Sequence, residues 1–318
     1  MSGPGMAVLL TGANGFVGRA LLRRLLSHGL GGRPVASLVA SDLNLEDLPA
    51  DARIRPVAGS IAEAGVLERA LAAPVDAVFH LASVPGGAAE QAPDTARRVN
   101  LDATLRLVDL LRAQGGAPRL VFASTVAVYG DPLPAWVDDA TPAQPALSYG
   151  AHKLAAEVLL ADADRRGWVQ ACSLRLPGIV ARPGDGAGLM SAFMSQLFWK
   201  LRDGQPLVLP VSACGTAWWL SVQACVDNLL LAACLDTARL GPRRVVQVPA
   251  LHLSMQQVIA ALARICGPGR EALVRFEPQA QVQRLFAGYP PLHTPAAHAL
   301  GFRHDGSADE LVRRALTS

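Results

Sequence analysis

The sequence is short of lysine, of aromatic residues and of charge. Lys153 and Lys200 are the only lysines among 29 basic residues, and aromatic residues make up 5% of the 318 positions. The net charge is only +3, with no basic run interleaved with aromatics, so a nucleic-acid partner is not expected. Because no apolar stretch approaches the roughly 18 residues of a membrane helix and no signal-peptide pattern is visible, we expect a cytoplasmic protein without a membrane contact.

Cysteine is scarce as well. The five cysteines show neither C-x-x-C nor zinc-ligand spacing, which predicts buried free thiols, a reducing compartment and no metal site. Cys172 lies inside a predicted strand, so a structural thiol is favoured over a nucleophile there.

Apolar residues, by contrast, are plentiful, and in the first half they alternate between strand and helix patterns. Hydrophobic residues make up 51% of the chain, enough for a sizeable core. Strand patterns at 7–10, 35–39, 75–80, 119–123 and 170–174 are separated by helix patterns at 16–28, 64–72, 95–114 and 149–166. This alternation predicts an α/β protein with a doubly wound parallel sheet, the Rossmann fold.

The second half is less regular. Helices are expected at 189–202, 221–237, 254–266 and 309–316, between stretches rich in proline and glycine. We therefore expect a dinucleotide-binding domain over residues 1–175. Residues 176–318 should form mostly a smaller C-terminal substrate-binding lobe, interleaved with the last strands of the sheet.

A glycine-rich loop connects the first predicted strand to the first predicted helix. Gly12 permits a tight turn, Gly15 lets the backbone approach a pyrophosphate, and Gly18 lets the helix pack close to the sheet. The start of the helix then offers N–H groups and a positive dipole end to phosphates. An ordinary strand–helix turn is the alternative, but this context favours a dinucleotide site. Its expected ligands are Gly12, Asn14, Gly15, Phe16, Val17 and Gly18.

An acid follows the second predicted strand. Asp42 can accept hydrogen bonds from the adenosine ribose and would repel a 2′-phosphate, which favours NAD over NADP. The alternative is a surface aspartate, because the same loop carries Glu46 and Asp47.

Tyr149 and Lys153 open a predicted helix at positions i and i+4, so phenol and ammonium share one face. A nearby cation lowers the pKa of a phenol, which lets the tyrosine exchange a proton with a substrate hydroxyl. Chance gives this spacing in roughly 2% of such sequences, and a tyrosine packed on a lysine stem is the alternative. Ser124 and Thr125 end the preceding strand, where a hydroxyl can hold the reacting oxygen, unless they only cap a turn.

These residues resemble the extended short-chain dehydrogenase/reductase family, also described as NAD-dependent epimerases and dehydratases. The matching segments appear in order and are strongest in the first 180 residues. They are Thr11–Gly18, Phe79–Ser83, Val99–Thr104, Phe122–Gly130 and Tyr149 with Lys153.

The resemblance implies a role for each matching residue. Thr125, or its neighbour Ser124, would position the reacting oxygen, with Tyr149 as acid/base and Lys153 as its partner. The cofactor would further contact Leu81, Ala82, Ser83, Asn100, Tyr149, Lys153, Pro177 and Ile179, with Lys153 bonding the nicotinamide ribose. The family would also imply a homodimer formed through a four-helix bundle, built from the helices at 95–114 and 149–166.

Departures from the family pattern narrow the substrate. Ser60-Ile61 stands where an Asp usually meets adenine, and Gly178 stands where nucleotide-sugar enzymes often carry Asn. The first departure concerns adenine recognition, whereas Gly178 weighs against a sugar-nucleotide substrate. The segment around Trp219 resembles members that oxidise a small sugar acid such as D-erythronate at C2. Ser83, Thr125, Tyr149, Arg182 and Trp219 are the expected substrate contacts, although Arg182 could equally be a solvated surface arginine.

Two other functions stay open at this point. A nucleotide-sugar epimerase or dehydratase would return the hydride to its product and would not consume NAD. A non-enzymatic NAD-sensing protein would show no turnover, and the intact pair of Tyr149 and Lys153 argues against it.

Overall fold

The computed structural model describes residues 5–184 and 190–317. The chain folds into two compact units, each assembled from separate segments. Unit 1 comprises Met1–Val128, Pro145–Arg175 and Val226–Val246, and unit 2 comprises Tyr129–Gln144, Leu176–Cys225 and Gln247–Ser318. The expected division into 1–175 and 176–318 therefore differs at 129–144 and 226–246. The first of these segments joins unit 2 because Val137 pairs there with Leu292.

The central sheet confirms the predicted doubly wound α/β fold. Its seven strands, counted among the described residues, follow the order β10-β6-β5-β4-β1-β2-β3, and β3, β2, β1, β4 and β5 pair in parallel. From β1 the strands follow one another outward to β3 on one side, and from β4 they follow one another outward through β5 and β6 on the other. The order of the strands therefore switches between β1 and β4, which is where ligands bind in such sheets. The strands are β1 (Met6–Thr11), β2 (Val35–Asp42), β3 (Ile54–Ala58), β4 (Ala77–His80), β5 (Arg119–Thr125), β6 (Gln170–Leu176) and β10 (Val245–Gln247).

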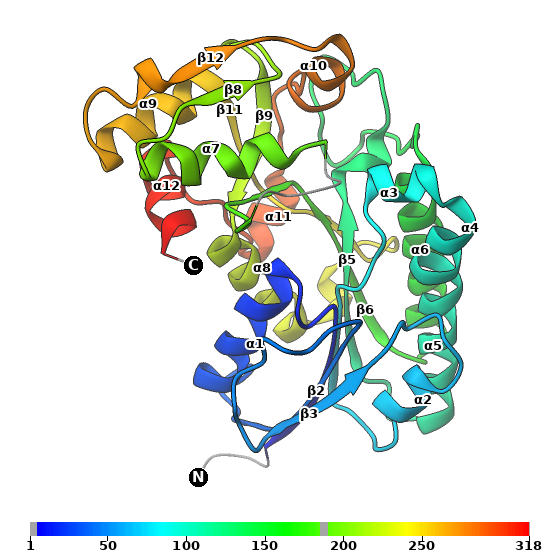
Figure 1. The fold of residues 1–318 in the computed structure, drawn as a ribbon. Helices are drawn as coiled ribbons and strands as arrows, with labels where there is room; N and C mark the ends of the chain where they lie inside the picture. Colours follow the sequence, from blue (N-terminus) through cyan, green and yellow to red (C-terminus); the bar gives the residue numbers. More distant parts are fainter. Residues whose placement is uncertain (1–4, 185–189, 318) are drawn as a thin grey trace. The chain divides into compact units, whose positions relative to one another are not determined.

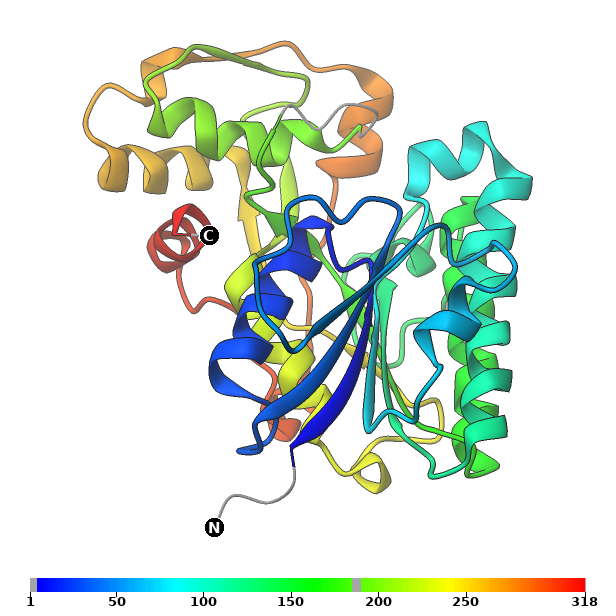
Figure 2. The same ribbon diagram turned by 60° about the horizontal axis from the view of Figure 1, so that its bottom comes forward.

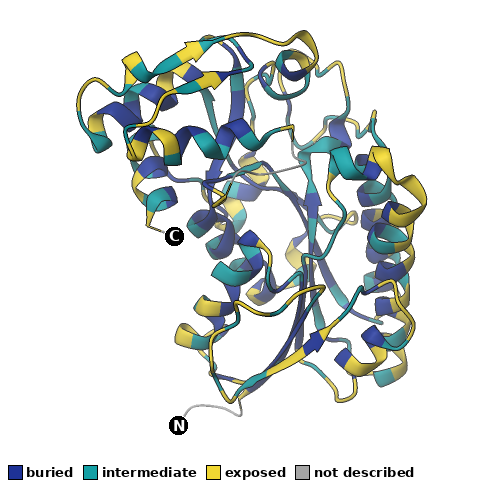
Figure 3. Cartoon of the chain, viewed as in Figure 1, coloured by how far each residue is buried: buried dark blue, intermediate teal, exposed yellow. Residues whose placement is uncertain are grey.

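Helices cover both faces of this sheet (Figures 1 and 2). On one face α1 meets the part of α8 that belongs to unit 1, through an ion pair between Arg24 and Asp227 at 3.1 Å. On the other face α2, α5 and α6 bury leucines such as Leu107 and Leu160 against Phe122 of β5. The inner strands such as β5 are consequently buried from both sides, whereas the edge strand β3 is largely exposed (Figure 3). These helices are α1 (Phe16–His28), α2 (Val66–Ala70), α3 (Gly86–Gln91), α5 (Ala103–Gln114), α6 (Ser148–Arg165) and α8 (Val222–Cys234).

The long helix predicted for 95–114 is interrupted. The structure has α4 (Pro93–Arg97), then a single π-helical turn, η1 (Arg98–Asp102), and only then α5. A π turn adds a residue to the helical repeat and commonly marks a functional position. Asn100 lies within it, with its side chain buried.

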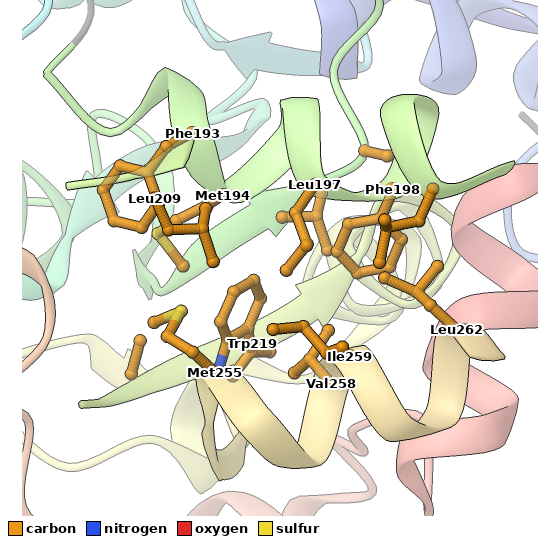
Figure 4. Packing of buried hydrophobic residues seen from close by; sticks show 14 of the residues in the cluster. Phe193, Met194, Leu197, Phe198, Leu209, Trp219, Met255, Val258, Ile259 and Leu262 are labelled. Carbon is orange, nitrogen blue, oxygen red and sulfur yellow. The ribbon is translucent and has the colours of Figure 1, made fainter. Parts of the chain in front are cut away.

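Unit 2 is built on a three-stranded sheet of order β11-β9-β7 and a parallel pair of β8 with β12. Its core packs Trp219 of β9 between Phe198 of α7 and Ile259 of α9 (Figure 4). The helix predicted at 189–202 begins at Ala192, and Leu189 lies outside the described residues. The elements are β7 (Gly178–Val180), β8 (Leu207–Leu209), β9 (Thr216–Ser221), β11 (Leu251–Ser254), β12 (Val274–Phe276), α7 (Ala192–Arg202), α9 (Met255–Cys266), α10 (Ala280–Phe286), α11 (Pro295–Leu300) and α12 (Ala308–Leu316).

The cysteines are free, but not all of them are buried. Cys172 is buried, which raises the pKa of its thiol to about 12, whereas Cys214 and Cys234 are exposed, contrary to the expectation. Of the helices formed by the described residues, none is long and apolar enough to cross a membrane.

Candidate active site

The glycine loop leaves β1 at Thr11 and enters α1 at Phe16, where contacts between backbones set its shape. Gly12 has φ +71°, and a Cβ placed on it would lie 2.8 Å from the Ala82 nitrogen in the segment after β4. A Cβ on Gly18 would lie 2.0 Å from the Gly12 oxygen. The first turn of α1 can therefore pack on the loop, and the loop on the segment after β4, only because these positions lack side chains.

Polar atoms at this loop suit a dinucleotide. The Asn14 Oδ1 and Ser41 Oγ atoms are buried without a hydrogen-bond partner, which is costly unless a ligand or water meets them. Helix α1 begins without a side-chain cap and without an acid in its first turn, so its positive end is left for phosphate. The loop thus fits the pyrophosphate of the expected cofactor.

Asp42 lies at the end of β2, beside the glycine loop. One carboxylate oxygen accepts from the Asn14 N–H at 2.8 Å, and the other accepts from the Leu43 N–H at 2.7 Å. Both oxygens keep a free lone pair, so the fixed carboxylate can still accept from ribose hydroxyls. Further along, Ser60 accepts from the Ala62 N–H at 3.3 Å and Ile61 is buried, so Ser60 shapes a turn where adenine was expected to bind.

Lys153 is one of the least exposed charged groups of unit 1, with 1% exposure. Its Nζ donates to the Ala123 carbonyl at 2.7 Å and lies 4.5 Å from the centre of the Phe122 ring and 5.8 Å from that of Tyr149. Burial lowers the pKa of Lys153 to about 7, and the charge of Glu157 opposes that shift. The Tyr149 and Lys153 pair predicted from the spacing thus lies together on α6, at the carboxyl end of β5.

A close backbone approach places Tyr149. A Cβ on the next residue, Gly150, would lie 2.5 Å from the Ala127 oxygen and 2.9 Å from the Pro145 Cβ. The first turn of α6 consequently packs directly on the chain that follows β5. Sequence reasoning missed this residue, although a glycine directly after the candidate tyrosine was a visible signal.

Below the pair lies a buried acid that sequence reasoning also missed. Glu157, one turn after Lys153 on α6, forms an ion pair of 2.8 Å with Arg175 of β6 and accepts a hydrogen bond from the Ser124 hydroxyl. All three residues are at most 5% exposed. The i+4 spacing between Lys153 and Glu157 was the available signal.

The two hydroxyls at the end of β5 therefore have different surroundings. The Ser124 hydroxyl is 2% exposed and directed at Glu157. Thr125 is half-buried, and its Oγ1 accepts from the Ala127 N–H at 3.1 Å, which leaves its own proton available.

The segment after β4 carries the remaining unit 1 candidates. Leu81, Ala82 and Ser83 are half-buried beside Gly12, and Asn100 holds the next residue, Val84. The Asn100 side chain accepts from the Val84 N–H at 2.7 Å and donates to its carbonyl at 2.9 Å. In this arrangement Asn100 supports the segment, since both of its polar side-chain atoms are used by Val84.

Four candidates lie in unit 2. Pro177 is buried directly before β7 and Ile179 is half-buried within it. Arg182 is exposed, with its carbonyl accepting from the Trp199 indole at 2.7 Å. Trp219 corrects an expectation, because its side chain is 0% exposed and donates to the Leu253 carbonyl at 3.0 Å. A side chain enclosed in the core cannot contact a substrate in this conformation.

The fold and the site define an NAD-dependent oxidoreductase. A model of the NAD dependent epimerase/dehydratase family matches residues 8–238, and the chain belongs to that family. The sequence-based prediction of the family and of NAD as cofactor is thereby confirmed.

Individual relatives match nearly the whole chain. D-erythronate dehydrogenase of Cupriavidus necator is 40% identical over 317 residues, which cover 97% of both chains. D-erythronate dehydrogenase of Haemophilus influenzae is 28% identical over 97% of this chain and 98% of its own. A solved structure described as the nucleoside-diphosphate-sugar epimerase from Agrobacterium tumefaciens shares 34% identity, with a TM-score of 0.91 over 98% of this chain and 93% of that chain.

The glycine geometry makes a first prediction. In Gly18→Ala the new Cβ would meet the backbone oxygen of Gly12 at 2.0 Å, so α1 must move away from the loop. We expect the Kd for NAD, measured by calorimetry, to rise at least about tenfold, equivalent to about 1.4 kcal/mol. Gly241→Ala is the control because a Cβ there meets nothing within 4 Å. Unchanged NAD affinity in Gly18→Ala would contradict this account of the loop.

A second prediction concerns acid stability. Burial, with a smaller effect of the Lys153 charge, lowers the pKa of His80 from 6.5 to about 3. As the pH falls below 6.5, the unfolded chain binds a proton that the folded chain excludes, so folding stability is lost toward acid. In His80→Gln this loss is absent. We expect the free energy of unfolding of the wild type, relative to that variant, to fall by roughly 1–2 kcal/mol between pH 6.5 and 5.

Urea unfolding at several pH values measures this difference. His28→Gln is the matched control, because His28 is exposed and should leave the pH dependence of the wild type unchanged. Parallel curves for the wild type and His80→Gln would show that His80 is not held neutral in the folded protein.

Proposed function

We propose that the protein oxidises a secondary alcohol of a small sugar acid, of the D-erythronate type, at C2. The observation that carries the chemistry is the buried Lys153 ammonium below Tyr149 at the carboxyl end of β5. The substrate class is supported by similarity to two D-erythronate dehydrogenases over 97% of the chain. Sugar-acid oxidation also assigns the protein to carbohydrate metabolism.

In the proposed reaction Tyr149 removes the proton of the substrate hydroxyl. Lys153 stabilises the phenolate, and the Ala123 carbonyl fixes the ammonium below the ring. Bound NAD would accept the hydride that leaves the substrate carbon carrying this hydroxyl. Thr125 donates its free hydroxyl proton toward the reacting oxygen, whereas Ser124 holds Glu157 in place.

The substrate carboxylate needs a recognition group. Ser83, half-buried beside the glycine loop, offers a hydroxyl, and Arg182 offers a guanidinium that can bind a carboxylate with two hydrogen bonds. Ser60 and Ile61 remain the proposed contacts of adenine, and Pro177 with Ile179 those of the nicotinamide end.

Nucleotide-sugar epimerisation is the second candidate function. It is favoured by the 34% identity and TM-score of 0.91 to the structure described as a nucleoside-diphosphate-sugar epimerase. The same Tyr149 and Lys153 pair would serve it, but the hydride would return to the product, so NADH would not accumulate.

The absorbance of NADH separates the two functions and yields a third prediction. With NAD and D-erythronate we expect net NADH, and none with a UDP- or dTDP-sugar. Tyr149→Phe removes the acid/base and should lower kcat about 10²–10⁴-fold. Its Kd for NAD, which should change less than about threefold, controls for correct folding. Sugar-nucleotide conversion without NADH, or full turnover by Tyr149→Phe, would refute the proposal.

We further propose a cytoplasmic homodimer in which α5 and α6 of two copies form a four-helix bundle. The five free cysteines suit a reducing compartment. On α6, Val158 is 62% exposed and Leu159 is 43% exposed, so this helix presents large apolar groups that its own unit does not cover.

The fourth prediction tests this interface. Leu159→Glu introduces a charge on the proposed contact and should convert the dimer to a monomer, as measured by light scattering at about 10 μM. Leu43→Glu, at a residue 72% exposed and outside both helices, should leave the dimer intact. A wild-type protein that is monomeric at that concentration would rule the bundle out.

A further inference from the structure

Four buried polar side chains connect the glycine loop of unit 1 with the segment after β4. They come from the end of β1, the end of β4, η1 and the start of α5, and each is at most 1% exposed. They are Thr11, His80, Asn100 and Thr104.

The hydrogen bonds among them form a closed path. Thr11 Oγ1 lies 2.7 Å from His80 Nδ1, and His80 Nε2 lies 2.9 Å from Thr104 Oγ1. Thr104 donates to the Asn100 carbonyl at 3.0 Å. The path then reaches Val84 through the Asn100 side chain, and it reaches Ala82, whose N–H donates to Thr11 Oγ1 at 3.3 Å.

Counting protons fixes the direction of every bond in the path. Thr104 has one hydroxyl proton, which it donates to the Asn100 carbonyl, so its oxygen must accept from His80 Nε2–H. A neutral ring then has an unprotonated Nδ1, which accepts from the Thr11 hydroxyl. Thr11 in turn uses its oxygen to accept from the Ala82 N–H.

The surroundings of the ring suit a neutral imidazole. Hydroxyl groups face both nitrogens, and the Phe122 ring stacks on it with centres 5.7 Å apart. The Lys153 ammonium, which lies over the same Phe122 ring, disfavours a second positive charge on the imidazole. A protonated ring would also place two donors against the Thr104 oxygen and the Thr11 hydroxyl and reverse the latter bond.

The path holds both ends of the segment 82–84. Ala82 is fixed through Thr11, the residue directly before Gly12, and Val84 is fixed through Asn100. The π turn at Arg98–Asp102 contains Asn100. The Thr104 hydroxyl, one turn further along, donates a hydrogen bond to the Asn100 carbonyl. These hydrogen bonds therefore fix the distance between the glycine loop and the segment after β4.

We propose that His80, as the neutral Nε2–H tautomer, is a positioning residue that holds the segment 82–84 against the glycine loop in the geometry that binds NAD. It acts through Thr11 and Thr104 and contacts neither cofactor nor substrate. The inference depends on NAD as cofactor and is independent of which alcohol is oxidised.

Thr104→Val tests the path at its centre and is the fifth prediction. It removes the acceptor of His80 Nε2–H and leaves a buried donor without a partner, at nearly unchanged volume. We expect the Kd and KM for NAD to rise about tenfold, while kcat with saturating NAD stays within about threefold. Thr104→Ser keeps the hydroxyl and should restore the wild-type Kd. Equal NAD affinity in Thr104→Val and wild type would overturn the proposal.

Nuclear magnetic resonance of the wild type tests the tautomer without any variant. Long-range proton–nitrogen correlation of ¹⁵N-histidine-labelled protein should show His80 protonated at Nε2 alone, unchanged from pH 8 to pH 5. The His80→Gln spectrum assigns the signal. A proton on Nδ1, or a doubly protonated ring at neutral pH, would overturn the proposal even if Thr104→Val failed to fold. Because NAD binding needs no substrate, failure of the sugar-acid proposal would leave the Kd for NAD and the resonance measurement unaffected.

Discussion

The arrangement of the active site depends on the cost of burying the Lys153 ammonium. A charge with 1% exposure loses its water shell, and the protein must replace that shell with its own groups. The Ala123 carbonyl, the Phe122 ring and the carboxylate of Glu157 provide this replacement. Glu157 is itself buried and needs partners, which are Arg175 and Ser124. The buried cation of Lys153 and its partners thus link α6, β5 and β6 through charge.

The cofactor side of unit 1 is organised by backbone proximity instead. Gly12, Gly18 and Gly150 each lie so close to another backbone that a Cβ would fall within 2.8 Å of it. These contacts bring the loop after β1, the segment after β4 and the start of α6 to one edge of the sheet. Phe122 contacts both networks, because its ring stacks on the His80 imidazole and also lies against the Lys153 ammonium.

Local patterns made the fold and the placement of Tyr149 and Lys153 on one helix predictable, because their signals lie within a few residues. The glycine loop and the pair of Tyr149 and Lys153 depend only on spacing along one element. The pair of Glu157 with Arg175 and the path through His80 join residues distant in sequence, and the π turn at Arg98–Asp102 has no simple periodicity. The substrate contact assigned to Trp219 was wrong because a tryptophan in an unusual segment can serve the core as readily as a ligand.

The structure also changes the argument about the substrate. By sequence alone, the glycine at 178 in place of asparagine weighs against nucleotide sugars. Within unit 2, however, a Cβ at Gly178 would lie 2.9 Å from the Met194 Cε and 3.0 Å from the Trp218 oxygen, so packing against β9 alone favours glycine there. The case for a sugar acid then depends on the extent of the similarity. The general family model ends at residue 238, whereas the likeness to the D-erythronate dehydrogenases covers 97% of the chain and so extends into the helices α9 to α12 of unit 2.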